Sequence, residues 1–167
     1  GAEGKAYEEY MKTEAFYLKE SSAINKAVFK KLKEDKETEL IIIPGDLSKD
    51  GEYESHKSLI KELNDLKESG KKIFVLTAGH DFNEHGRSYK NDEFVPVKGT
   101  EFKELYNLYY EFGYKDSISV HEETLSYIAE IAENTRVLAL NCDSKRECKG
   151  LIDESLLNWS KEQLDNA

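Results

Sequence analysis

The chain has 167 residues and a mass of 19.2 kDa, which is about the size of one domain. Its 24 basic and 34 acidic residues leave a formal net charge of −10. This balance argues against a nucleic-acid polymer as partner, because binding its phosphates requires a basic face. No apolar run approaches the roughly 18 residues of a membrane-spanning helix, and the polar start does not resemble a signal peptide. We therefore expect no membrane partner, and the sequence indicates no cellular compartment.

The N-terminal part of the chain has the periodicity of a helix. Residues 3–35 predict a helix that is broken near Ser21 and Ser22, where a serine can cap the second segment. Apolar residues recur at helical spacing in that second segment and predict one buried stripe: Ile24, Ala27, Val28 and Leu32.

Two apolar strands on either side of a helix come next. The aliphatic run at 40–44 predicts a strand buried on both faces, as in a parallel sheet, and a second run at 73–77 predicts another. Residues 53–69 predict the helix between them, with Gly70 at its C-terminal cap. Its expected inner face comprises Ser55, His56, Leu59, Ile60, Leu63 and Leu66. A strand–helix–strand unit of this kind is nearly always parallel and right-handed.

The rest of the sequence predicts further helices and strands. Residues 82–100 are polar and loop-like, and residues 101–113 predict a helix rich in tyrosine. Strands are expected at 125–131 and 135–141, and a last helix begins after the N-cap residue Asp153. The fold class predicted from these elements is a layered α/β domain.

Polar side chains stand where the two predicted parallel strands end. Asp46 follows the first strand, and His80 and Asp81 follow the second. Ligands of open α/β sheets bind beyond the carboxyl ends of the strands, so these residues are expected to lie together. A carboxylate and an imidazole at one sheet edge suit a divalent metal ion. The alternative is that each turn only shapes the backbone, as many Gly-Asp turns do.

These two segments resemble the signatures of the calcineurin-like metallophosphoesterases. Residues 44–52, Pro-Gly-Asp-Leu-Ser-Lys-Asp-Gly-Glu, are similar to the second signature, a Gly-Asp with a glycine five residues beyond the aspartate. Residues 74–83, which include Gly-His-Asp, resemble the third, Gly-Asn-His-Asp. Later stretches, around 101–114, 126–129 and 156–159, are similar to a bacterial branch, so the resemblance covers nearly the whole chain.

The resemblance implies an activity and a role for each of the three polar residues. It implies metal-dependent hydrolysis of a small phosphoester, either a monoester or a diester, with a cyclic nucleotide as one case. Asp46 would bridge two divalent metal ions, Mn, Fe or Zn, since a carboxylate can neutralise two adjacent cations. His80 would donate a proton or a hydrogen bond to the phosphate or the leaving oxygen, and Asp81 would orient it.

Three departures from the family pattern change what this chain is expected to do. Gly79 stands where the family has a metal-binding asparagine, and neither the first Asp-x-His signature nor the last histidine signatures occur. We therefore expect residues 1–167 to form one partial domain, the N-terminal half to two-thirds of the family's α/β sandwich. It is expected to be inactive alone, to bind metal weakly or not at all, and to self-associate or pair with the missing part. A catalytically dead relative that serves as a binding or structural domain is the rival hypothesis.

Other polar residues are assigned mainly structural roles. His56 is expected to hydrogen-bond beneath the Asp46 loop, and His85 and His121 are expected to be solvated. Asn141 and Asp143 end a predicted strand at the same sheet edge and could support the site.

Arg87 and the tyrosine-rich segment each leave an alternative open. Arg87 is a candidate phosphate contact, although a solvated loop arginine is the simpler interpretation. Core packing is favoured over base stacking for the aromatic residues Tyr106, Tyr109, Tyr110, Phe112 and Tyr114.

Overall fold

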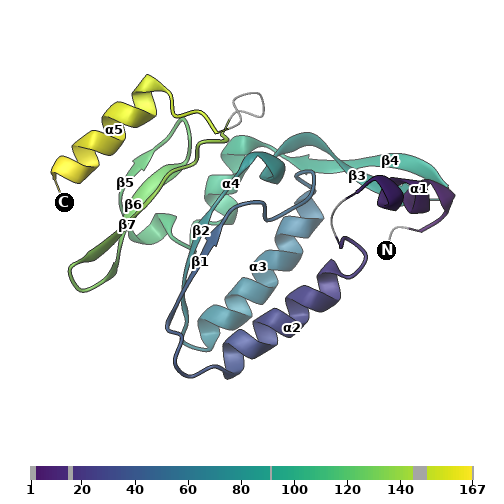
Figure 1. The fold of residues 1–167 in the computed structure, drawn as a ribbon, viewed down its shortest axis with the longest axis horizontal. Helices are drawn as coiled ribbons and strands as arrows, with labels where there is room; N and C mark the ends of the chain where they lie inside the picture. The colour runs from purple at the N-terminus through teal and green to yellow at the C-terminus, as the bar shows by residue number, and fades with distance from the viewer. Residues whose placement is uncertain (1–2, 15–16, 91, 145–149, 167) are drawn as a thin grey trace.

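A computed structural model describes residues 3–14, 17–90, 92–144 and 150–166, and the structural findings concern these residues. They form a mixed α/β fold with five α-helices and three small separate sheets (Figure 1). In the described part of the chain, no helix is both long and apolar enough to cross a membrane.

The first sheet confirms the predicted parallel pair. β1 (Leu40–Pro44) and β2 (Lys72–Leu76) pair in parallel over their whole lengths, and α3 (Tyr53–Glu68) connects them. β2 has a buried centre, whereas Ile42 of β1 is 49% exposed. The expected burial of β1 on both faces is therefore wrong. Its odd-numbered isoleucines pack against the core, but Ile42 points to the opposite face, which the described residues leave uncovered.

α2 (Ser21–Glu34) begins where the chain was expected to break, but its cap and its buried face differ from the prediction. The Ser21 hydroxyl donates a hydrogen bond to a carbonyl of the preceding turn, so it does not cap the helix. Ile24 and Val28 are about half exposed, and Phe29 is the buried residue. Packing against α3 turns the helix so that Phe29 faces the core and most of the predicted stripe does not.

The stretch 82–100, expected to be a loop, is an antiparallel hairpin. β3 (Asn83–Lys90) pairs with β4 (Glu93–Thr100), and α1 (Lys5–Thr13) lies against the outer part of this hairpin (Figure 1). Asp92, at the turn, has a φ of 64°, a left-handed conformation that aspartate tolerates. Few residues of the hairpin are apolar, so the hydrophobic periodicity of residues 82–100 did not indicate strands.

A three-stranded antiparallel sheet with a helix over it forms the C-terminal part. The strands β5 (Ser117–His121), β6 (Ser126–Ala132) and β7 (Thr135–Ala139) lie in sequence order, and α5 (Glu154–Asp165) packs beside β5. The sequence predicted β6, β7 and α5 but missed β5. The Asp153 side chain accepts a hydrogen bond from a backbone N–H of the first turn of α5, which confirms its role as N-cap.

The aromatic segment joins the parallel pair to the C-terminal sheet. α4 (Phe102–Leu108) is shorter than the predicted helix, and the residues after it continue into the core. The Val75 N–H donates to the Phe112 carbonyl at 2.7 Å, and the Tyr127 hydroxyl donates to the Val75 carbonyl at 3.0 Å. Tyr109 is fully buried, and these contacts confirm that the aromatic residues mainly pack in the core.

Candidate functional site

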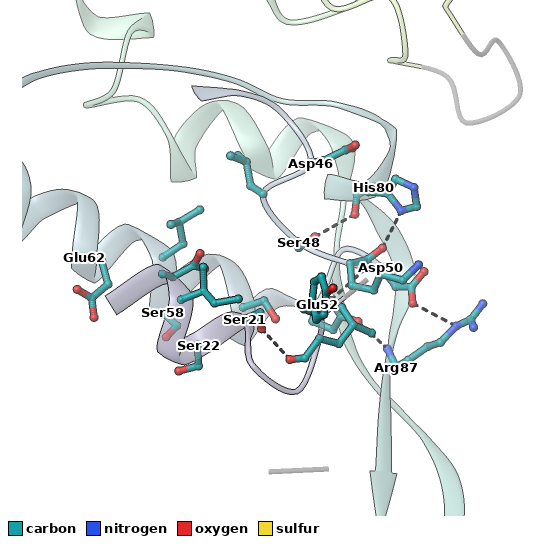
Figure 2. Close-up of a pocket in the computed structure, with 18 of the residues that line it drawn as sticks. Ser21, Ser22, Asp46, Ser48, Asp50, Glu52, Ser58, Glu62, His80 and Arg87 are labelled. Atoms are coloured by element: carbon teal, nitrogen blue, oxygen red, sulfur yellow. Dashed lines mark hydrogen bonds and ion pairs between the residues drawn. The ribbon is translucent and has the colours of Figure 1, made fainter. Parts of the chain in front are cut away.

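The loops that follow β1 and β2 meet at the carboxyl ends of the two strands. A Cβ atom added to Gly45 would lie 2.6 Å from the Cβ atom of Ala78, so the two loops touch and leave no room for a side chain at position 45. The Ser48 hydroxyl donates to the His80 carbonyl at 2.9 Å. Asp46 is exposed and His80 is half-buried, and both lie on the same side of this edge (Figure 2). The prediction that they lie at one sheet edge is confirmed.

The carboxylate of Asp81 holds the two loops together. One oxygen accepts hydrogen bonds from the backbone N–H groups of Leu47 and Ser48, at 2.5 and 3.0 Å, and the other accepts from Ala78 N–H at 2.8 Å. Asp81 is fully buried. Burial raises its pKa to about 6, with a small further contribution from the charge of Asp46, while the three N–H donors oppose the rise. Asp81 thus fixes the backbone that presents Asp46.

His80 is oriented by a backbone carbonyl. Its Nδ1 lies 2.8 Å from the Lys49 carbonyl oxygen, which can only accept, so Nδ1 carries a proton. In the neutral ring Nε2 therefore holds the lone pair, and His80 can act as an acid only after Nε2 gains a second proton. Lys49 thus provides the orienting contact that the resemblance assigned to Asp81, whose carboxylate bonds to backbone N–H groups.

A buried histidine supports the loop from below. His56 of α3 lies 2.8 Å through Nε2 from the carbonyl of Asp81 and 2.6 Å through Nδ1 from the Tyr109 hydroxyl. The carbonyl requires Nε2 to be the donor, so Nδ1 accepts the hydrogen bond that the Tyr109 hydroxyl donates. Burial lowers the pKa of His56 and keeps the ring neutral. The expected hydrogen bond beneath the loop is confirmed.

The segment after β7 fills the space beside Gly79. A Cβ atom added to Gly79 would clash with the Asp143 carboxylate, lying 2.8 Å from its carbon. The Asp143 N–H donates to the Asn141 side-chain oxygen at 3.0 Å, and the Asn141 amide lies 3.5 Å from the Thr77 hydroxyl. Asn141 and Asp143 were expected to end a strand of the same sheet, but they follow β7, which belongs to the separate C-terminal sheet. Their expected position beside the site is confirmed by these contacts with Thr77 and Gly79. Asp143 occupies the place that a side chain at position 79 would need.

We predict that Gly79→Asn lowers the free energy of unfolding by roughly 1–3 kcal/mol, because the new side chain must displace the Asp143 carboxylate. Urea unfolding of Gly79→Asn, Asp143→Ala and the double variant measures this cost and the coupling between the two positions. Asp143→Ala should relieve most of the destabilisation. Purely additive effects of the two substitutions would contradict the overlap.

The titration of Asp81 gives a second prediction. The pKa of about 6 in the folded state exceeds the ordinary value of 3.8, so the folded state binds this proton more tightly than the unfolded state does. Its contribution to stability is present below about pH 4 and is lost as pH rises through about 6, amounting to roughly 3 kcal/mol. Asp81→Asn should remove this part of the pH dependence in urea unfolding measured between pH 4 and 7. An unchanged slope would contradict it.

Two histidines outside the loops were expected from the sequence to lie at the surface. His85 of β3 is exposed, as expected, with Nε2 3.8 Å from a Glu84 carboxylate oxygen. His121 was expected at the surface but is 9% exposed, and its ring nitrogens lie 2.9 Å from the Thr124 hydroxyl and 3.1 Å from the Ser155 hydroxyl. The acidic residues that follow it suggested a surface position. However, His121 is the last residue of β5, and its side chain faces α5.

A pocket that the sequence did not indicate adjoins Asp46 and His80. Its volume is about 730 Å³, and it lies between the loop after β1, the helices α1, α2 and α3, and strand β3 (Figure 2). Arg87 of β3 lines it, with Nε 3.4 Å from a carboxylate oxygen of Asp50. No sequence motif marks this pocket, because its walls come from several separate segments.

The described residues supply few potential metal ligands. Within residues 3–14, 17–90, 92–144 and 150–166, no group of three or more His, Cys, Asp or Glu side chains could hold a metal ion. Zinc sites generally use at least three protein ligands. The described residues therefore supply an incomplete set of ligands for a metal centre.

In comparisons with known proteins, no family model matches the chain and no curated protein matches it.

Proposed function

We propose that the chain contributes the Asp46–His80 edge of a phosphoester hydrolase of the calcineurin-like type. The observation that carries the proposal is the placement of these two side chains at the ends of adjacent parallel strands, on loops fixed by the Asp81 carboxylate. This is the position in which open α/β sheets bind ligands. The mixed α/β fold is compatible with a partial metallophosphoesterase sandwich, which we propose as its finer class.

His80 would serve the reaction through Nε2. With Nδ1 bound to the Lys49 carbonyl, the protonated ring presents Nε2–H to a phosphate oxygen or to the departing alcohol oxygen. Asp46 would hold two divalent cations through its carboxylate, and it is an exposed residue at the sheet edge. The described residues supply too few metal ligands, so residues outside the described part of the chain would complete the site.

A binding domain without catalysis is the second candidate function, and two observations favour it. Gly79 stands where the family has a metal-binding asparagine, and the Asp143 carboxylate fills the space beside it. The described residues also hold no group of three potential metal ligands. Under this hypothesis the chain keeps the fold and the two loops but binds a partner without hydrolysing it.

The metal content of the full-length gene product separates the two functions. We expect elemental analysis after gel filtration in metal-free buffer to find two divalent ions per chain, together with hydrolysis of bis-p-nitrophenyl phosphate. The same protein treated with a chelator is the control, and adding Mn²⁺ back should restore turnover. A protein free of metal and without turnover in Mn²⁺ would favour the binding domain.

The 167-residue chain alone is expected to bind Mn²⁺ weakly. The Asp46 carboxylate alone cannot offset the repulsion between two adjacent cations, so most of the coordination free energy is missing. Isothermal titration of Mn²⁺ into the purified chain should therefore show no saturation at micromolar concentrations. Two tightly bound ions per chain would contradict this prediction and reveal ligands that we have not identified.

A further inference from the structure

His121 is a buried histidine to which the proposed function assigns no role. It ends β5, and α5 packs beside that strand (Figure 1). Its Nε2 lies 3.1 Å from the Ser155 hydroxyl in the first turn of α5, and its Nδ1 lies 2.9 Å from the Thr124 hydroxyl. A serine within hydrogen-bond reach of a histidine whose other nitrogen is held by a third group is the arrangement of an activated nucleophile.

The hydrogen bonds beyond Thr124 decide which nitrogen of His121 carries the proton. The Thr124 hydroxyl donates to the Ser126 hydroxyl oxygen at 2.8 Å, so its single proton is not available to the imidazole ring. Nδ1 is therefore the donor to Thr124, and Nε2 of the neutral ring holds the lone pair. In this tautomer Nε2 accepts the proton of the Ser155 hydroxyl, which is the direction that a general base requires.

Packing of α5 fixes this geometry. The Trp159 indole N–H donates to the Ser119 hydroxyl at 3.1 Å, and the indole ring lies 5.7 Å from the His121 ring. Leu156, the residue after the serine, is buried, and His121 is 9% exposed. Ser155 itself is exposed. The hydroxyl is therefore open to a reagent in solution, while most of the histidine that would accept its proton is shielded from water.

The start of α5 supplies a donor for the negative charge that develops when the serine attacks a carbonyl group. Ser155 is the second residue of the helix, and its backbone N–H has no acceptor within the described part of the chain. N–H groups in the first turn lack intrahelical partners and lie at the positive end of the helix dipole. The N–H of the nucleophile itself is a common member of an oxyanion hole.

Acidic side chains surround this serine and restrict the compounds that it can meet. Glu122 and Glu123 follow the histidine, and Asp153 and Glu154 precede the serine, and all four are exposed. Their charges repel anionic compounds and favour the imidazolium ion that forms when the histidine accepts the proton. The surroundings therefore favour an uncharged or cationic reagent.

We propose that Ser155 is a nucleophile, separate from the Asp46–His80 edge, that takes the acyl group of small uncharged or cationic carboxylic esters. Its oxygen attacks the ester carbonyl, and its proton passes to Nε2 of His121. The bond from the carbonyl carbon to the alcohol oxygen then breaks, the alcohol leaves with that proton, and the acyl group stays on the serine. Water attacks this new ester in the same way and releases the acid. Thr124 is a positioning residue, because it keeps Nδ1 protonated.

Diisopropyl fluorophosphate and p-nitrophenyl acetate, both uncharged, are the probes for this nucleophile. The first forms an oxygen–phosphorus bond with an activated serine and releases fluoride, and the second acetylates it. Mass spectrometry of the 167-residue chain treated at pH 8 should locate both labels on Ser155. Ser155→Ala should remove them, whereas Ser58→Ala, which removes an exposed serine of α3, should leave them unchanged. Absence of both labels from Ser155 would overturn the proposal.

Variants of the histidine and the threonine distinguish an activated serine from one that is only exposed. His121→Gln should lower the labelling rate by at least about 100-fold and abolish the fall in rate that we expect in the unmodified sequence between pH 8 and pH 5. Circular dichroism checks that this variant folds.

A second pair of variants leaves the histidine in place. Thr124→Val keeps the shape without the hydroxyl and should lower the rate by about tenfold or more, whereas Thr124→Ser keeps the hydroxyl and should retain it. If His121→Gln does not fold, this pair decides. Labelling of Ser155 that is as fast in folded Thr124→Val as in Thr124→Ser would overturn the proposal.

Discussion

Asp46→Asn in the full-length gene product is expected to reduce phosphoester turnover by at least about 100-fold while the protein stays folded. The substitution removes the charge with which Asp46 would hold its cations, since an amide oxygen is a neutral and much weaker ligand. The fold should tolerate it, because Asp46 is exposed and its φ of 54° lies in the left-handed region, which asparagine also adopts readily. Turnover at saturating Mn²⁺ and far-ultraviolet circular dichroism measure the two effects.

Asp92→Asn is the matched control for this variant. Asp92 is also exposed with a positive φ of 64°, but it lies at the turn of the β3–β4 hairpin, away from the loop that holds Asp46. A change of activity that came only from the left-handed backbone would occur in both variants. Undiminished turnover in Asp46→Asn would show that the Gly-Asp is a turn and not part of a catalytic centre.

Asp81→Ala should lower the free energy of unfolding by roughly 3 kcal/mol, the largest stability effect that we expect at this edge. The substitution leaves three backbone N–H groups, on two loops, without their carboxylate acceptor. It keeps the Asp81 carbonyl, so the hydrogen bond from His56 survives and the loss is confined to the carboxylate. Urea unfolding followed by circular dichroism gives the free energy directly.

An exposed aspartate provides the reference for that measurement. Asp116→Ala, before β5, should change the free energy of unfolding by less than about 0.5 kcal/mol. A loss in Asp81→Ala no larger than in Asp116→Ala would mean that water replaces the carboxylate without cost. The two loops would then be held by other contacts.

The sequence predicted the parallel pair and the meeting of its two loops because both follow from local patterns. Two aliphatic runs flank an amphipathic helix, and a right-handed crossover then brings the following residues to one sheet edge. Asp46 and His80 are adjacent to those strand ends in sequence, so the topology alone places them together. His56 was predicted to support the loop because helical spacing puts it on the inner face of α3.

The parts that the sequence did not predict depend on contacts between distant segments. The β3–β4 hairpin has few apolar residues and is covered by α1, whose contact with it no local pattern encodes. The pocket combines several segments that are distant in sequence and carries no motif. The Lys49 carbonyl orients His80 in place of the Asp81 carboxylate, and this depends on which hydrogen bonds the folded loops make. Spacing alone cannot distinguish a carboxylate that orients a ring from one that binds backbone N–H groups.

The hydrogen-bonded chain from Tyr109 through His56 to Asp81 has a consequence for how the loop after β1 moves. Surface loops usually open in local fluctuations that cost far less than unfolding the whole protein. Here the loop is bound to Asp81, Asp81 to His56, and His56 to a fully buried tyrosine of the core. The Leu47 and Ser48 amides thus belong to the same cooperative unit as that core. Slow hydrogen exchange, usual for a central strand, would then extend to these loop amides, and Asp46 would remain in position for as long as the protein stays folded.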